Sequence, residues 1–114
     1  MLFVSDLPRM TAFYADILGL KPIEETRLEN YVEFDAGEAT FALHAIPVEA
    51  RCTISSPPQP RESNPVKLSF EVEDVSAECE KLKRSGVTIL QRPWGAYEGV
   101  DPEGNIFGIY ATSA

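Results

Sequence analysis

The chain has 114 residues, of which 44% are hydrophobic and 25% are charged, and its formal net charge is −8. This length suffices for one hydrophobic core but is too short for two independent cores. The negative charge, with no local basic patch to oppose it, argues against a nucleic acid or an anionic membrane as partner. No apolar run is long enough to cross a bilayer.

The cysteines and the first residues indicate the cellular compartment. Cys52 and Cys79 lack the CxxC spacing and the nearby histidines of a zinc or redox motif, so we interpret them as reduced thiols. Residues 1–4 are apolar but are followed at once by Ser5 and Asp6, which leaves no room for the apolar region of a signal peptide. We therefore expect a cytoplasmic protein.

The first half predicts one strand, one helix and three strands. Residues 1–4 form a short apolar run, and Asp6 with Pro8 is typical of a helix start. Apolar residues then recur at spacings of three and four until Gly19, which ends the helix. Three strands are expected at residues 22–27, 31–35 and 39–46.

Residues 47–65 hold five of the nine prolines and show no sustained periodicity, which indicates a linker. Residues 66–72 then alternate apolar and polar side chains, as a strand packed on one face does. Asp74 is the expected cap of a second helix that ends at Gly86. Further strands are expected at residues 87–91, 95–100 and 105–110, so the second half repeats the order of the first.

A turn signal near the carboxyl end is the sharpest local motif. Asp101, Pro102 and Gly104 suit a type I turn, which predicts a hairpin between the last two strands. A weaker copy occurs 66 positions earlier, where Ala42 aligns with Gly108. The copy indicates an internally duplicated architecture.

The chain resembles the vicinal oxygen chelate superfamily of glyoxalases, bleomycin resistance proteins and extradiol dioxygenases. The resemblance rests on the order strand, helix and three strands, which occurs twice, on the segment from Phe3 to Leu20, and on Asp101-Pro102-Glu103-Gly104-Asn105. The resemblance implies an α+β fold in which two βαβββ modules form a curved mixed sheet, a cup with the helices outside. We expect a single domain over residues 1–114, with module one at 1–46, the proline-rich linker at 47–65 and module two at 66–114.

The same resemblance implies four metal-ligand positions, on the first and last strand of each module. They fall just before residue 1 and on Ala42, Lys67 and Gly108. Alanine and glycine carry no donor, and an ammonium is not a metal ligand. We therefore expect no cofactor. A shift of two positions in the fourth strand would bring in His44, which keeps a divalent metal as an alternative.

Strand parity predicts which side chains line the cup. An inward Lys67 needs a carboxylate, either Glu33 or Glu71, or else an anionic ligand. His44 is the only histidine and is either a base or ligand or a structural side chain. Trp94 sits at a strand turn and either stacks on a flat ligand or packs at a contact. The candidate ligand-binding residues are Tyr31, Glu33, His44, Lys67, Ser69, Glu71, Trp94, Tyr97 and Tyr110.

These residues favour binding of a small organic molecule, an acidic one in particular, by a homodimeric protein without the usual metal site. Bleomycin resistance proteins in the superfamily imply such a role. The alternative is an enzyme of the lyase, isomerase or dioxygenase type, which would use Lys67 and His44 without metal or a metal bound through His44. A third hypothesis is an interaction subunit whose cup is filled by its own side chains.

Overall fold

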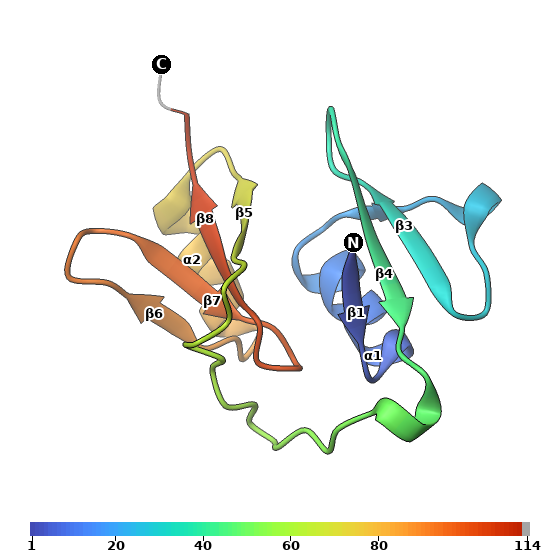
Figure 1. Cartoon of the computed structure of the whole chain (residues 1–114). Coiled ribbons are helices and arrows are strands. Elements are labelled where there is room, and N and C mark those ends of the chain that lie inside the picture. Colours follow the sequence, from blue (N-terminus) through green and yellow to red (C-terminus); the bar gives the residue numbers. More distant parts are fainter. Residues whose placement is uncertain (113–114) are drawn as a thin grey trace. The chain divides into compact units, whose positions relative to one another are not determined.

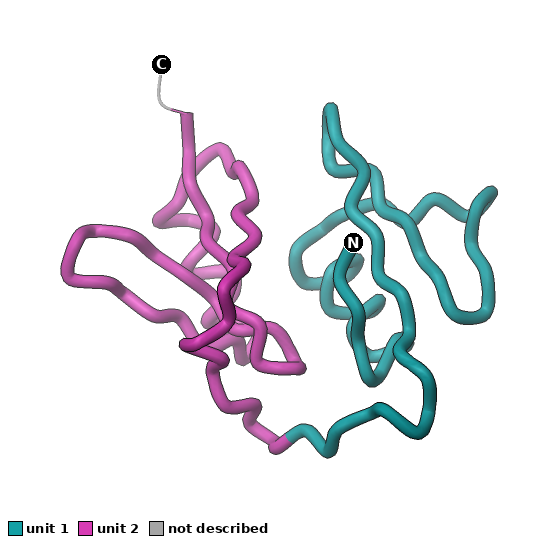
Figure 2. Tube along the Cα trace, in the orientation of Figure 1, with its two compact units in different colours: residues 1–54 teal, residues 55–114 magenta. Residues whose placement is uncertain are grey.

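The computed structural model describes residues 1–112. The chain divides into two compact units, the first formed by residues 1–54 and the second beginning at residue 55 (Figure 2). Each unit holds one four-stranded mixed sheet with a helix on one side (Figure 1). The expected α+β class is confirmed. No helix within residues 1–112 is long and apolar enough to cross a membrane.

Unit 1 follows the predicted order of elements. Its strands run in the order β1-β4-β3-β2, with β1 parallel to β4 and the other pairs antiparallel. The elements are β1 (Leu2–Val4), α1 (Leu7–Ala12), a π-helical turn η1 (Phe13–Ile17), β2 (Lys21–Pro22), η2 (Glu24–Thr26), β3 (Tyr31–Asp35), β4 (Thr40–Ala45) and η3 (Val48–Ala50).

The core of unit 1 lies between α1 with η1 and one face of the sheet. Asp6 caps the helix, because its Oδ1 accepts a hydrogen bond from the amide of Arg9 at 3.1 Å. Tyr14 is fully buried, with ring centroids 4.9 Å from Phe41 and 6.5 Å from Phe34. Alternation along the strands places a different set of side chains on the helix-free face of unit 1, namely Phe3, Tyr31, Glu33, Ala42 and His44.

Unit 2 has the same plan, with the strand order β5-β8-β7-β6 and β5 parallel to β8. Its elements are β5 (Leu68–Glu71), α2 (Val75–Arg84), β6 (Ile89–Gln91), β7 (Tyr97–Val100) and β8 (Ile106–Tyr110). Asp74 caps α2 by accepting from the amide of Ala77 at 3.1 Å. The helix-free face of unit 2 carries Ser69, Glu71, Glu98, Gly108 and Tyr110.

The predicted hairpin at residues 101–105 is confirmed. The amide of Gly104 donates to the carbonyl of Asp101 at 2.9 Å, and Gly104 has a φ of 89°, which glycine adopts without strain. The fully buried Asp101 carboxylate accepts from the amides of Glu103 and Asn105, each at 2.9 Å. Arg61 of the linker also holds the turn, because its amide donates to Gly104 and its Nε to the Glu103 carbonyl, both at 2.9 Å.

Several predicted elements differ from the structure, and the strands expected at 87–91 and 95–100 each begin two residues later. The strand expected at residues 22–27 ends at Pro22, because the amide of Arg27 and the hydroxyl of Thr26 bond back to the carbonyls of Glu24 and Ile23 and close a 3-10 turn. The strand expected at 66–72 is confined to β5. The first helix is α-helical only as far as Ala12 and continues as η1.

Candidate functional site

The strands pair in the same register in both sheets, which locates the four metal-ligand positions that the resemblance implies. In unit 1 Leu2 pairs with Leu43, and in unit 2 Phe70 pairs with Ile109. Each residue of β1 therefore corresponds to the residue 68 positions later, in or directly after β5, and each residue of β4 corresponds to the residue 66 positions later, in or directly after β8. Ala42 and Gly108 are equivalent, as the sequence predicts.

The residues at these positions do not fit a metal ion. Ala42 and Gly108 provide no donor atom, and a Cβ built on Gly108 would lie 2.8 Å from the Ser69 hydroxyl oxygen. Lys67 provides an ammonium, which is engaged by a carboxylate. Within residues 1–112 no three His, Cys, Asp or Glu side chains gather as a metal site requires. We derive no chemistry through a metal at these positions.

Lys67 belongs to an ion network on the helix-free face of unit 2. Its Nζ lies 2.5 Å from Oε2 of Glu98, and Nε of Arg92 lies 2.5 Å from Oε1 of the same carboxylate. The two terminal nitrogens of Arg92 donate hydrogen bonds to the carboxylate of Glu62 at 2.8 and 3.2 Å. The partner of Lys67 is thus Glu98, which corrects the expectation of Glu33 or Glu71.

The network keeps the Glu98 carboxylate ionised. Burial alone would raise the pKa of Glu98, whose side chain is only 5% exposed, but the hydrogen bonds from Lys67 and Arg92 outweigh burial and lower it. Bonds to Glu62 and then Glu98 raise the pKa of Arg92. The two cations and two carboxylates of the network balance in charge. Because the Lys67 side chain is 42% exposed, its ammonium still faces solvent.

His44, Tyr31 and Phe3 form an aromatic group on the helix-free face of unit 1. The His44 ring centroid lies 5.4 Å from that of Phe3 and 6.1 Å from that of Tyr31. Nδ1 of His44 lies 2.8 Å from the Ala45 carbonyl. Because a carbonyl only accepts, Nδ1 carries the proton in this bond, and in the neutral ring Nε2 is then an acceptor.

Glu33 lies beside this aromatic group, opposite Ala42 in the sheet. The hydroxyl of Tyr31 donates to Oε2 of Glu33 at 2.6 Å. Hydrogen bonds from Thr26 and then Tyr31 lower the pKa of Glu33, and the bond to Glu33 raises the pKa of Tyr31. The structure therefore brings together three of the predicted site residues, His44, Tyr31 and Glu33.

The remaining predicted residues are spread over unit 2. Ser69 lies beside Gly108, and Glu71 pairs with Tyr110 and accepts from the Thr112 hydroxyl. Trp94 lies between β6 and β7 and is 72% exposed, with the Arg92 guanidinium 5.9 Å from its ring.

Tyr97 departs from the prediction that it lines the cup. It pairs with Ile109 in the sheet, so it shares the face of Phe107 and Phe70 and not that of Lys67. Its neighbour Glu98 points to the helix-free face instead. Strand parity alone explains the difference, because adjacent residues point to opposite faces.

Sequence reasoning missed Glu98 and Arg92. The alternation of β7 contained a signal for Glu98, since it places this residue on the same face as Gly108. Arg92 precedes the hairpin at Trp94, where no periodicity indicates a direction for the side chain.

The family model described as glyoxalase/bleomycin resistance protein/dioxygenase superfamily matches residues 1–109. Similar solved structures include an integron cassette protein from Vibrio cholerae, 24% identical over 98% of this chain and 91% of that one, with a TM-score of 0.70. A lactoylglutathione lyase from Agrobacterium tumefaciens is 23% identical over 97% and 89%, with a TM-score of 0.67. An antibiotic-binding protein from a Streptomyces species is 21% identical over 98% and 91%, with a TM-score of 0.66.

At these identities the solved structures support the fold alone. A comparison with curated protein sequences found no match. The family model covers nearly the whole chain, and both units repeat the same strand order. The chain belongs to the glyoxalase/bleomycin resistance protein/dioxygenase superfamily.

Proposed function

We propose that the chain binds a small acidic organic molecule on the helix-free face of unit 2, without a metal at the superfamily's usual ligand positions. The observation that carries this proposal is the ion pair of Lys67 with Glu98, at a position where the superfamily places a metal ligand. A fixed ammonium offers the positive charge that a metal would otherwise present to an oxygen of the ligand.

The geometry of Lys67 leaves capacity for a ligand. An ammonium has three N–H donors, and the bond to Glu98 occupies one of them. The cluster of Lys67, Arg92, Glu98 and Glu62 is charge-balanced, but the Lys67 side chain is 42% exposed, so its other N–H groups are open to a ligand. A ligand carboxylate or enolate-like oxygen would complete the hydrogen bonding of Lys67.

Binding of a small molecule has a parallel among the similar structures, one of which is described as an antibiotic-binding protein. For this chain we infer sequestration of a small molecule by a cytoplasmic homodimer. Dimer formation and location are checked by light scattering of the purified protein and by fractionation of the native host.

A second candidate function is catalysis with His44 as the base. The bond from Nδ1 to the Ala45 carbonyl fixes the ring and leaves the Nε2 lone pair as acceptor, which is the form a general base needs. Tyr31, a neighbour of His44, stays a protonated phenol because Glu33 raises its pKa. Catalysis requires turnover of a screened ligand that His44→Gln abolishes while binding persists.

The decisive experiment screens organic acids by thermal shift and measures metal content in the same preparation. We expect substoichiometric metal, and stabilisation by at least one acid that is lost in Lys67→Met. The matched control is Lys83→Met, which removes an exposed lysine paired with Glu80 at 3.9 Å. Stoichiometric metal, or equal affinity in Lys67→Met and the control, would overturn the proposal.

A further inference from the structure

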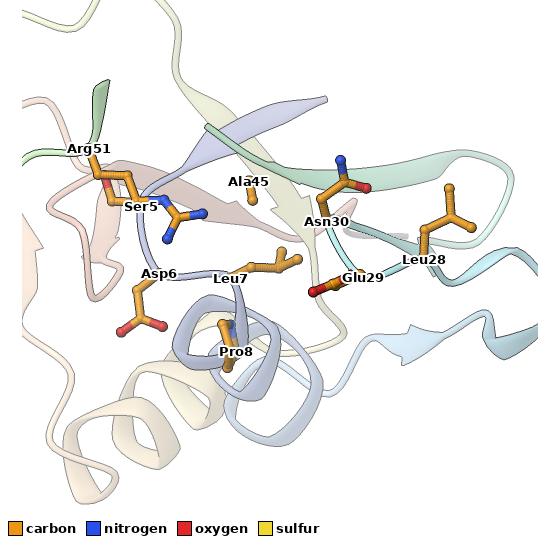
Figure 3. Close-up of a pocket in the computed structure, with 9 residues that line it drawn as sticks. All are labelled: Ser5, Asp6, Leu7, Pro8, Leu28, Glu29, Asn30, Ala45 and Arg51. Atoms are coloured by element: carbon orange, nitrogen blue, oxygen red, sulfur yellow. The ribbon is translucent and has the colours of Figure 1, made fainter. Parts of the chain in front are cut away.

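A cavity of about 680 Å³ opens in unit 1, where β1 ends and α1 begins (Figure 3). Its wall is built from the turn between β1 and α1, from the loop before β3, from the end of β4 and from Arg51. This volume lies within the range of small-molecule sites, roughly 300 to 1,000 Å³.

The cavity is separate from the surface proposed to bind an acid. Ala45 lines it and pairs with Val4, which is 1% exposed and belongs to the core beneath α1. His44 precedes Ala45 and points to the helix-free face. None of the candidate residues on the helix-free faces lines the cavity.

Arg51 supplies a positioned cation to this cavity. Its Nε donates to the Ile46 carbonyl at 3.0 Å, which fixes the plane of the guanidinium. The next residue is tied to the same wall, since the amide of Cys52 donates to the Ser5 hydroxyl at 3.4 Å. In Figure 3 the guanidinium lies beside Ser5 and is directed toward the middle of the labelled residues. Its two terminal nitrogens match the two oxygens of a carboxylate.

The rest of the wall combines negative charge with apolar surface. Glu29 and Asp6 contribute carboxylates, and Oδ1 of Asp6 also accepts from the amide of Arg9. Asn30 adds an amide, while Leu7 and Ala45 add apolar surface. In Figure 3 the Glu29 carboxylate and the Arg51 guanidinium come from opposite sides of the cavity.

We propose that this cavity binds a small zwitterion, with its carboxylate on Arg51 and its ammonium on Glu29. Asp6 caps α1, whereas the Glu29 carboxylate faces Arg51 across the apolar surface of Leu7 and Ala45. This arrangement is complementary to a molecule with both charges and an apolar body between them. The volume of about 680 Å³ has room for a molecule of dipeptide size.

The test uses the full-length chain labelled with ¹⁵N and the dipeptide alanyl-leucine as the probe. We expect amide shifts that saturate at millimolar concentration and are centred on Ser5, Asn30 and Ala45. The N-acetylated and C-amidated forms of the dipeptide each lack one charge and should bind roughly tenfold more weakly or worse.

Single substitutions test which side chain binds each charged group of the dipeptide. Arg51→Gln should weaken binding of alanyl-leucine roughly tenfold, whereas Arg27→Gln, which changes an arginine of the same unit outside the cavity, should not. Glu29→Gln is compared with Glu25→Gln in the same way. Binding of either blocked dipeptide as tight as that of alanyl-leucine, no saturable shift, or shifts centred on Tyr31 and His44 would overturn the zwitterion site and leave the proposal for Lys67 untouched.

Discussion

Replacing Glu98 by glutamine would test whether the ion network of unit 2 stabilises the fold as well as shaping the surface. The substitution keeps the size of the side chain but removes its charge. Two charge-assisted hydrogen bonds weaken, those from Lys67 and Arg92, each 2.5 Å long in the wild type. We expect the free energy of unfolding to fall at pH 7.

The magnitude follows from exposure. Removing one partner of a fully buried ion pair costs about 3 to 5 kcal/mol. Here the carboxylate is 5% exposed, but Lys67 is 42% exposed and can be hydrated in the variant, and Arg92 keeps Glu62. The expected loss for Glu98→Gln is therefore about 2 kcal/mol, near the value for hydrogen bonds to charged groups.

The loss should depend on pH. Since the folded protein lowers the pKa of Glu98 below its ordinary value of 4.5, the network stabilises the fold above that pH. This stabilisation disappears as the pH falls through the lowered pKa. The difference between wild type and Glu98→Gln should accordingly be full at pH 7 and shrink well below pH 4.5.

Urea unfolding followed by circular dichroism at pH 7 and pH 3 measures both effects. Glu80→Gln is the matched control, because Glu80 forms an exposed pair with Lys83 and its loss should cost less than about 0.5 kcal/mol. The reasoning is refuted if Glu98→Gln costs no more than the control, or if its cost is the same at both pH values.

Three further predictions concern single residues. Gly99→Ala should destabilise the protein by about 2 kcal/mol in urea unfolding, because its Cβ would overlap the buried ring of Phe107, with Cε2 at 2.9 Å; the double variant with Phe107→Leu should cost less than the sum of the single changes. Asp101→Ala should cost about 3 kcal/mol by the same assay, since it leaves two buried amides without their acceptor; a loss below 1 kcal/mol would contradict this. Tyr31→Phe should raise the pKa of Glu33 in an NMR titration, and an unchanged pKa would mean that the hydroxyl bond is not formed in solution.

The parts of the fold that sequence predicted correctly are those whose causes are local. Asp6 and Asp74 cap helices by bonding amides three residues ahead, and Asp101 closes a turn within four residues. Each effect depends on neighbours that the sequence itself shows. These three aspartates therefore mark element boundaries without any knowledge of the tertiary structure.

The errors arise where several weak local preferences compete. Residues 22–27 have strand-like spacing, but Thr26 can bond the Ile23 carbonyl and Arg27 can pair with Glu24 at 3.0 Å, so a short turn replaces the strand. Side chains that bond nearby carbonyls commonly compete with sheet ladders in this way. Periodicity alone does not show whether the strand or the turn is the more stable.

The partner of Lys67 was beyond local reasoning. Glu98 lies 31 residues away, and the pair forms only because β5 and β7 both flank β8 in a particular register. Strand alternation predicted the face of the sheet on which Lys67 lies, but it did not predict which carboxylate would pair with it. The aromatic group around His44 was easier, because β3 and β4 are joined directly and Tyr31 and His44 are paired in the hairpin.

Because the two sheets have the same register, equivalent residues of units 1 and 2 can be compared within one protein. Glu33 lies opposite Ala42, and Glu98 lies opposite Gly108, so two glutamates occupy the same place in two copies of one backbone plan. One carboxylate accepts from the hydroxyl of Tyr31, and the other accepts from an ammonium and a guanidinium. Comparing the titration of the two carboxyls in one sample would therefore set the effect of neutral donors on a half-buried acid beside the effect of paired cations on a buried acid, at the same place in the strand.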